Sequence, residues 1–239
     1  MLKQTTFTKD QQAELAQLVD VIALSKKSCE RPMLANLVYA TKKNFIGRPI
    51  AGYTPGVTDF ALLTRDSAIA LCQVQNELLE KYNYGLLIYD TYRPKSAVLD
   101  FMQWSKQPVS DDADGHCELE RKQKHYPHIE KNRLFALGYL SETSQHCFGH
   151  TVDLVLIDKE GAELNLGARF DFMDEISHLS ATAKEIGEEA MRNRHILTST
   201  MEKYGFASYV YEFWHFSYCE KAIADPMDIT ITADLKNLS

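Results

Sequence analysis

Apolar residues recur at two different spacings along this chain, and each spacing predicts a different kind of element. The clearest helical spacing, with an apolar residue at every third or fourth position, covers residues 65–82, and Thr64 can cap its start. The same spacing predicts a first helix over residues 8–24 and a long helix over residues 182–204, which ends at Gly205. Helices are therefore expected near both ends of the chain and in its first third.

Short, unbroken apolar runs predict buried strands at residues 86–89 and 154–157. Gly85 separates the first run from the helix before it. Pro94 follows that run and favours the start of another helix, whose inward-facing residues are expected to be Val98, Phe101 and Met102. Residues 208–218 are rich in aromatic side chains and predict a final strand.

The order of these segments favours one α+β domain over residues 1–239. The strands are separated by segments of unequal length, which argues against a regular series of βαβ units. A chain of 239 residues, 45% of them hydrophobic, can bury one sizeable core. Residues 108–133 are polar and charged without a clear period, so we expect them to form a surface insertion with one short helix.

Composition narrows the class of protein further. A formal net charge of -7 argues against binding nucleic acid through the overall field. No segment approaches the ~18 consecutive apolar residues of a membrane span. The five cysteines are odd in number and form no CxxC pair, which is typical of reduced thiols, and the polar first ten residues lack a signal-peptide pattern. We therefore expect a soluble, cytoplasmic protein that binds neither nucleic acid nor a membrane.

The first group of chemically interesting residues lies between Ser144 and Asp153. His146 is followed by Gly149 and then by Asp153 at the head of an apolar strand. The glycine allows a tight turn, so that the imidazole and the carboxylate can converge on one ion. A carboxylate in an apolar strand is costly unless it is paired or bound to a metal. Taken alone, the segment also fits a capped turn with a hydrogen-bonded histidine.

A second interpretation of this segment pairs His146 with His150 as an HxxxH zinc motif on a helix. The metalloprotease form of that motif has a glutamate directly after the first histidine. Here Cys147 occupies that position, and Gly149 weakens a helix. The helical interpretation is therefore the less favoured one.

The second group is Glu212 and His215, which lie three residues apart among Phe213, Trp214 and Phe216. Aromatic neighbours can exclude water and orient an imidazole. On a regular strand, residues three apart face opposite sides. For both side chains to reach one ion, the strand must bend between them or Glu212 must precede it; otherwise the segment is a half-buried strand with a solvated glutamate.

The third group is Arg93, which follows the strand at residues 86–89 and can point into a cleft, or else form a surface ion pair with Asp90. Together the groups supply a histidine, an aspartate and a second histidine, plus a spare carboxylate and a cation. A catalytic zinc site uses three protein ligands and keeps one open position for water. It also uses a base for that water and a positive charge for the developing oxyanion.

These motifs resemble those of the D-Ala-D-Ala dipeptidases, the VanX-like zinc peptidases. The resemblance rests on SxHxxGxxxD at residues 144–153 and ExxH at residues 212–215. Further similar segments lie, in the family's order, at residues 39–47, 52–53, 92–95, 167–178 and 193–194. The resemblance implies a central, mainly antiparallel sheet flanked by helices, a fold shared with other DD-peptidases and the hedgehog signalling domain. It also implies one Zn²⁺ per chain and hydrolysis of D-Ala-D-Ala or closely related small dipeptides.

The resemblance further assigns a role to each of nine residues. The implied metal ligands are His146, Asp153 and His215. The implied catalytic residues are Glu212, as general base, and Arg93, as the group that stabilises the oxyanion. The implied substrate-binding residues are Asp171 and Tyr39 for the ammonium, and Ser144 and Tyr53 near the carboxylate.

Two departures from the family pattern, Gln145 and Phe213, leave the dipeptide preference open. Two other functions also stay open on the same fold. One is a cell-wall carboxypeptidase or endopeptidase, which would need access to exported peptidoglycan. The other is a binding module that keeps zinc without catalysis, against which the presence of Glu212 and Arg93 argues.

Overall fold

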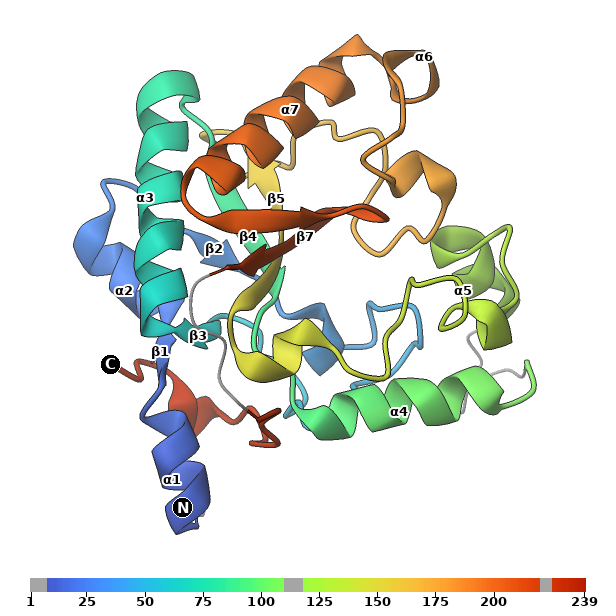
Figure 1. Cartoon of the computed structure of the whole chain (residues 1–239), viewed down its shortest axis with the longest axis horizontal. Coiled ribbons are helices and arrows are strands. Elements are labelled where there is room, and N and C mark those ends of the chain that lie inside the picture. Colours follow the sequence, from blue (N-terminus) through green and yellow to red (C-terminus); the bar gives the residue numbers. More distant parts are fainter. Residues whose placement is uncertain (1–7, 110–117, 220–224) are drawn as a thin grey trace.

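The structure of the protein, a computed structural model, describes residues 8–109, 118–219 and 225–239. Within these ranges the chain forms seven α-helices and seven β-strands (Figure 1). The helices are α1 (Lys9–Leu15), α2 (Val21–Ser28), α3 (Arg65–Tyr82), α4 (Lys95–Lys106), α5 (Glu118–His125), α6 (Ala183–Ile186) and α7 (Glu188–Lys203). The strands are β1 (Leu18–Asp20), β2 (Leu34–Ala35), β3 (Leu62–Thr64), β4 (Gly85–Asp90), β5 (Thr151–Ile157), β6 (Phe206–Tyr209) and β7 (Glu212–Tyr218).

The central sheet has five strands in the order β2-β4-β5-β7-β6. The pair β2 and β4 is parallel, and the other neighbouring pairs are antiparallel. A separate antiparallel pair joins β1 to β3. The expected α+β fold with a mainly antiparallel sheet is thereby confirmed.

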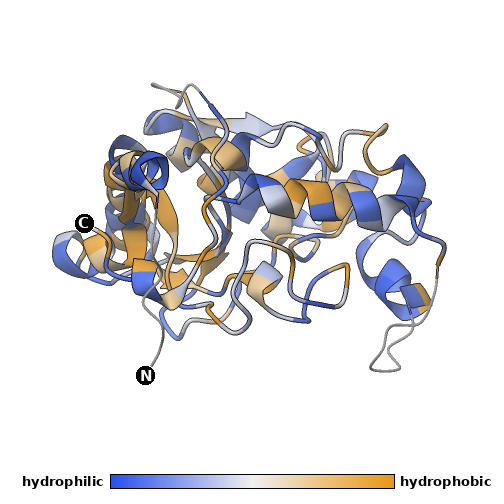
Figure 2. Cartoon of the chain, turned by 90° about the horizontal axis from the view of Figure 1, so that it is seen from below, coloured by the Kyte–Doolittle hydropathy of each residue, from blue (hydrophilic) through white to orange (hydrophobic). Residues whose placement is uncertain are grey.

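Strand β5 separates the two main parts of the core. Because successive side chains of a strand face opposite sides, Val152, Leu154 and Leu156 pack with residues of α3 and α7 in one hydrophobic cluster. Val155 belongs to the other cluster, together with aromatic residues such as Trp214. Asp153, which alternates with these residues, therefore lies on the face of the sheet opposite α3 and α7. In Figure 2 the strands carry mostly hydrophobic residues, while α4 shows both hydrophobic and hydrophilic residues along its length.

Several expected elements occur where the sequence predicts them, although both strands are longer than expected. The helix over residues 65–82 and the strands around 86–89 and 154–157 are confirmed, as is a helix directly after Pro94. The ends differ in detail: Asn83, with a left-handed φ of 56°, ends α3, rather than Gly85. Thr64 precedes α3 but contacts the Ser67 hydroxyl (2.7 Å) instead of a backbone amide.

Three expected elements are wrong in their extent. The helix over residues 8–24 is interrupted because β1 pairs with β3, and Asp20 then caps α2 by accepting from the amides of Ile22 and Ala23. The helix over residues 182–204 is two helices, since Gly187 adopts a φ of +86° between them. The strand over residues 208–218 is a hairpin of β6 and β7.

The expected surface insertion at residues 108–133 stays a prediction, and residues 110–117 lie outside the described ranges. Its described part contains α5 and a short 3-10 helix. Tyr126 is buried, and the buried Lys131 Nζ lies 2.7 Å from a carboxylate oxygen of Glu118. Tyr126 and Lys131 both contact Trp104 of α4, with 5.8 Å between the two ring centroids and 5.1 Å from Lys131 Nζ to the Trp104 ring, so the described part of this segment packs against α4.

Glu77 ties α3 to α7 by accepting hydrogen bonds from Lys203 and Tyr204, and from Lys81 on its own helix. Lys203, Lys81 and Tyr204 lower the pKa of Glu77 to about 2. We expect Glu77→Gln to lower the free energy of unfolding at pH 7, because the two lysines lose their charged partner. The loss should be only about 1–2 kcal/mol, because solvent screens the half-exposed lysines.

The pH dependence of this difference follows from the lowered pKa. An unfolded glutamate has a pKa of about 4.3, so the contribution of Glu77 is fully present above that pH and is lost as the pH falls toward 2. Urea unfolding of the parent and of Glu77→Gln between pH 7 and pH 2 measures it. A difference that stayed constant over this range would contradict the prediction.

Candidate metal centre and active site

His146 is carried by a single turn of 3-10 helix, Gln145–Phe148. Gly149 ends that turn with a φ of +69°, and a Cβ there would lie 2.7 Å from a methyl carbon of Leu18. The buried His146 donates from Nδ1 to the carbonyl of Thr91 over 2.6 Å. This hydrogen bond leaves the lone pair of Nε2 to face Asp153 and His215.

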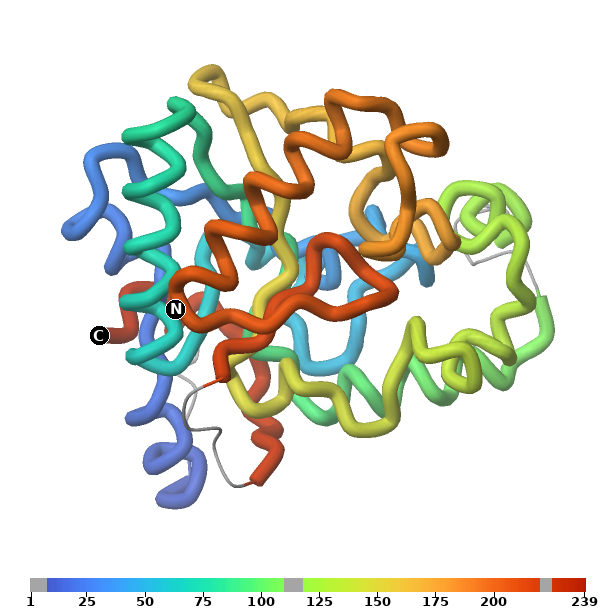
Figure 3. The backbone as a smooth tube through the Cα atoms, turned by 45° about the horizontal axis from the view of Figure 1, so that its top comes forward, coloured from blue at the N-terminus to red at the C-terminus, as the bar shows by residue number. Residues whose placement is uncertain are grey.

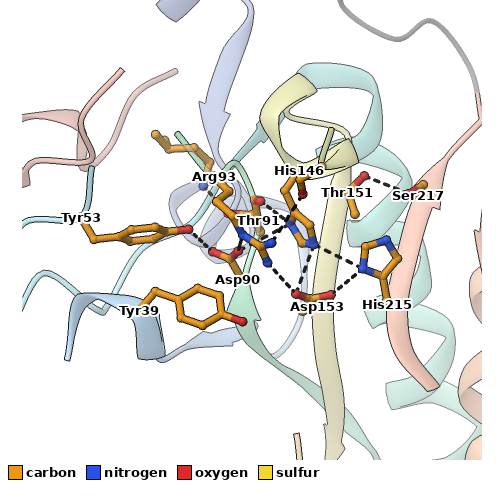
Figure 4. Close-up of polar contacts among 12 residues, drawn as sticks. Tyr39, Tyr53, Asp90, Thr91, Arg93, His146, Thr151, Asp153, His215 and Ser217 are labelled. Carbon is orange, nitrogen blue, oxygen red and sulfur yellow. Dashed lines mark hydrogen bonds and ion pairs between the residues drawn. The ribbon is translucent and has the colours of Figure 1, made fainter. Parts of the chain in front are cut away.

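Asp153 and His215 are paired residues on the neighbouring strands β5 and β7. Paired residues project from the same face of a sheet, which places both side chains beside His146 (Figure 4). His146 Nε2 lies 3.2 Å from Asp153 Oδ2, and His215 Nδ1 lies 3.0 Å from Asp153 Oδ1. The two histidine nitrogens, His146 Nε2 and His215 Nδ1, are 3.3 Å apart.

These three side chains fit one metal ion. One ligand atom from each lies within 4.8 Å of the others, and among the described residues no other such group of His, Cys, Asp and Glu occurs. Ligand atoms of a tetrahedral zinc site are roughly 3.3 Å apart, given bonds of about 2.0–2.2 Å. Asp153 Oδ1 is buried without a well-formed hydrogen bond, as expected of an atom that is available to a cation.

The alternative HxxxH pair is wrong, because the helical turn ends at Phe148, before His150. His150 Nδ1 instead lies 3.4 Å from the carbonyl of Phe148. Cys147 is buried and is not part of the group of possible ligands.

Glu212 is the first residue of β7 and is 9% exposed. Ser208 of β6 pairs with Phe216 of β7, but the next residue of β6, Tyr209, pairs with Glu212, four residues before Phe216. This irregularity is the bend that the spacing of Glu212 and His215 requires. Glu212 Oε2 consequently lies 3.6 Å from His215 Nδ1. Burial, and then the charge of Asp153, raise the pKa of Glu212 well above its usual range.

Arg93 is held in a buried network rather than in a surface ion pair. Its Nε donates to Asp90 Oδ2 over 2.8 Å, and its Nη2 lies 3.4 Å from Asp153 Oδ2. Asp90 is fully buried and also accepts a hydrogen bond of 2.6 Å from the Tyr53 hydroxyl (Figure 4). Burial opposes the charge of Arg93, but the carboxylate of Asp90 raises the pKa of Arg93 above its usual value.

Asp171 lies on the same side of the sheet, and its two carboxylate oxygens accept from the Tyr39 hydroxyl at 3.2 and 3.0 Å. Burial, and then the charge of Asp153, raise the pKa of Asp171 well above its usual value. The Ser144 hydroxyl lies 3.5 Å from Arg93 Nη1. Tyr53 lies behind Asp90, which its hydroxyl contacts.

A cavity of about 280 Å³ connects these groups. Eight of the nine residues identified from the sequence line it: Tyr39, Arg93, Ser144, His146, Asp153, Asp171, Glu212 and His215. Tyr53 is not among the lining residues, whereas Tyr139, Tyr209 and Trp214 are. Tyr139 and Tyr209 lie in no motif that marks them as site residues, and the sequence position of Asp90 indicated only a surface partner of Arg93.

Among the residues that the structure describes, none of the helices combines the length and the apolar content that crossing a membrane requires.

The family described as D-ala-D-ala dipeptidase matches residues 31–232, a range that contains all nine residues singled out above.

Individual relatives are similar over most of their length. The D-alanyl-D-alanine dipeptidase of Enterococcus faecalis is 40% identical over 188 residues, which are 78% of this chain and 86% of the relative. The protein of the same name from Enterococcus faecium is 38% identical over 179 residues, or 74% and 82% of the two chains. That of Escherichia coli is 28% identical over 207 residues, or 85% and 90%.

Proposed function

The chain belongs to the D-ala-D-ala dipeptidase family of peptidases, and on that basis we propose that it hydrolyses D-alanyl-D-alanine, or a closely related small dipeptide, to free amino acids. We propose one zinc ion per chain as its cofactor. The observation that carries this proposal is the convergence of His146, Asp153 and His215 beside a buried carboxylate, Glu212, in one small cavity.

His146, Asp153 and His215 would hold the ion. Two imidazoles and one carboxylate would form a ligand set that suits zinc, and all three side chains line the cavity in which a substrate would bind. When bound, zinc polarises a carbonyl oxygen and lowers the pKa of a water ligand toward ~7. The Thr91 carbonyl fixes the ring of His146, so this ligand is oriented before any ion arrives.

Glu212 is the proposed general base. It is not one of the three proposed ligands, yet its carboxylate lies beside them, 3.6 Å from His215 Nδ1, and lines the same cavity. Glu212 would take a proton from the attacking water and then pass it to the departing amine, and its raised pKa makes it a stronger base than an ordinary glutamate.

Arg93 is the proposed partner of the oxyanion that forms during attack. Asp90 keeps its guanidinium in place by one short contact, and Nη2 is left to point toward Asp153 and the cavity. A preorganised cation near a developing negative charge is typically worth about 3–4 kcal/mol in the transition state. Tyr53, expected near the substrate carboxylate, is better explained as a residue that acts on Arg93 through Asp90.

Asp171 and Tyr39 are the proposed receptors of the free ammonium of the substrate, and Ser144 lies where the substrate carboxylate would bind. A buried carboxylate gains most from a cation that enters with the substrate. A cavity of about 280 Å³ is at the small end for ligand sites, which favours a dipeptide over a longer chain.

The direct test is a rate measurement on the purified, metal-analysed protein. We expect release of D-alanine from D-Ala-D-Ala, loss of activity after chelation and recovery with zinc. We expect N-acetyl-D-Ala-D-Ala to be cleaved at least about a hundredfold less efficiently, because Asp171 would be left buried without its cation. A protein with one zinc per chain that cleaved none of the D,D-, L,D- or L,L-dipeptides would refute the enzymatic proposal and favour a binding module.

A further inference from the structure

Asp171 has a backbone conformation that its surroundings must maintain. Its φ is 56°, in the left-handed region, and it is one of three non-glycine residues with positive φ among those described. Such a conformation is uncommon for residues other than glycine, and contacts with neighbouring groups help to hold it. Tyr39 contacts the carboxylate of Asp171, whereas a different group contacts its backbone carbonyl.

The end of α5 supplies that group. His125 Nδ1 lies 3.0 Å from the carbonyl oxygen of Asp171, and the carbonyl of His125 accepts from the amide of Met173 over 2.6 Å. A third contact joins His128 Nδ1 to Asp174 Oδ2 over 2.6 Å. Figure 3 shows α5 lying beside the chain that follows residue 170.

The protonation state of His125 decides the direction of its hydrogen bond. A carbonyl oxygen can only accept, so Nδ1 of His125 must carry the proton. Burial lowers the pKa of His125 to about 4, which keeps the ring neutral at neutral pH. His125 lines a second cavity, of about 510 Å³, which shares Asp171 with the catalytic cavity as a common wall. His125 thus holds the backbone of Asp171 from one side while the carboxylate faces the other.

We propose that His125 is a positioning residue for substrate specificity: its hydrogen bonds to the Asp171 carbonyl and the Met173 amide hold this stretch of backbone so that the carboxylate of Asp171 faces the catalytic cavity. This inference rests on the proposed function, in which Asp171 receives the substrate ammonium. The consequence is that part of the preference for a free amino terminus resides in α5, outside the catalytic cavity itself.

The test compares two substitutions of similar size. His125→Asn can still donate from its side-chain amide near the position of Nδ1, whereas His125→Leu fills space without a donor. For each variant we would measure kcat and KM on D-Ala-D-Ala, and the inhibition constant of propionyl-D-alanine, which is the same molecule without its amino group. For His125→Leu we expect a roughly tenfold rise in KM, with kcat and the inhibition constant nearly unchanged. The KM of His125→Asn should lie close to that of the parent protein.

A KM and an inhibition constant that rose together in His125→Leu would show a general loss of structure and would overturn the proposal. An unchanged KM, or no rescue by His125→Asn, would also overturn it. Asp171→Asn, measured in parallel, separates this inference from the function beneath it. If Asp171→Asn leaves the KM unchanged, the ammonium receptor itself is wrong; if it raises the KM while His125→Leu does not, only the role of His125 is wrong.

Discussion

Replacing Glu212 with glutamine should lower kcat on D-Ala-D-Ala by at least about 10²–10⁴-fold while the bound metal persists. Glutamine keeps the shape of the side chain and removes its basicity. Glu212 lies beside the group of ligands but is not a member of it, so metal content should be unaffected. The measurement is steady-state kinetics with elemental analysis of the same samples.

A matched control is Glu80→Gln, which makes the same chemical change at an exposed position of α3. This variant should keep the parent kcat and the parent metal content. If Glu212→Gln hydrolysed the dipeptide at nearly the parent rate with its metal in place, the base would have to be another residue, and the proposed mechanism would be wrong.

Removing one imidazole from the group of ligands should abolish both metal binding and activity. In His215→Ala or His146→Ala, two side chains remain, and we expect the affinity for zinc to fall by more than about 100-fold. Competition with a chelator of known affinity measures this loss directly, without reference to turnover.

His150→Ala is the matched control for both ligand variants. His150 is buried like His146 and lies only four residues along the chain, yet it is outside the group of possible ligands. Its replacement should leave zinc affinity and most of the activity intact. Full retention of zinc by His215→Ala, or its loss from His150→Ala, would mean that the proposed ligand set is wrong.

The sequence predicted those parts of the fold whose local pattern agrees with their final environment. Apolar runs such as residues 154–157 are buried whatever their neighbours, and β5 is indeed buried along its whole length. Errors arose where distant pairing overrides a local pattern. Leu18 has helical spacing with its neighbours but pairs with Thr64 in a strand. The long helix is divided for a local reason instead, since Gly187 adopts a φ of +86° between α6 and α7.

The residues of the site could be predicted from the sequence, but the hydrogen-bond partners that orient them could not. Resemblance assigned roles to nine residues, and the structure brings eight of them to one cavity. The hydrogen bonds behind them join distant positions: Thr91 to His146, Tyr53 to Asp90, and His125 to Asp171. No spacing or local period signals such contacts, because each depends on how the strands and the segments between them are assembled.

The alternation of side chains along β5 has a consequence for protein engineering. Val152, Leu154 and Leu156 face α3 and α7, whereas Asp153, between two of them, faces the cavity. The helical layer can therefore be repacked while the backbone position of Asp153 is preserved, provided that the total side-chain volume is kept. In laboratory evolution, thermostabilising substitutions sought at the interface of α3 and α7 can be combined with changes of substrate range sought around the cavity, because the two sets of positions share a strand but not a face.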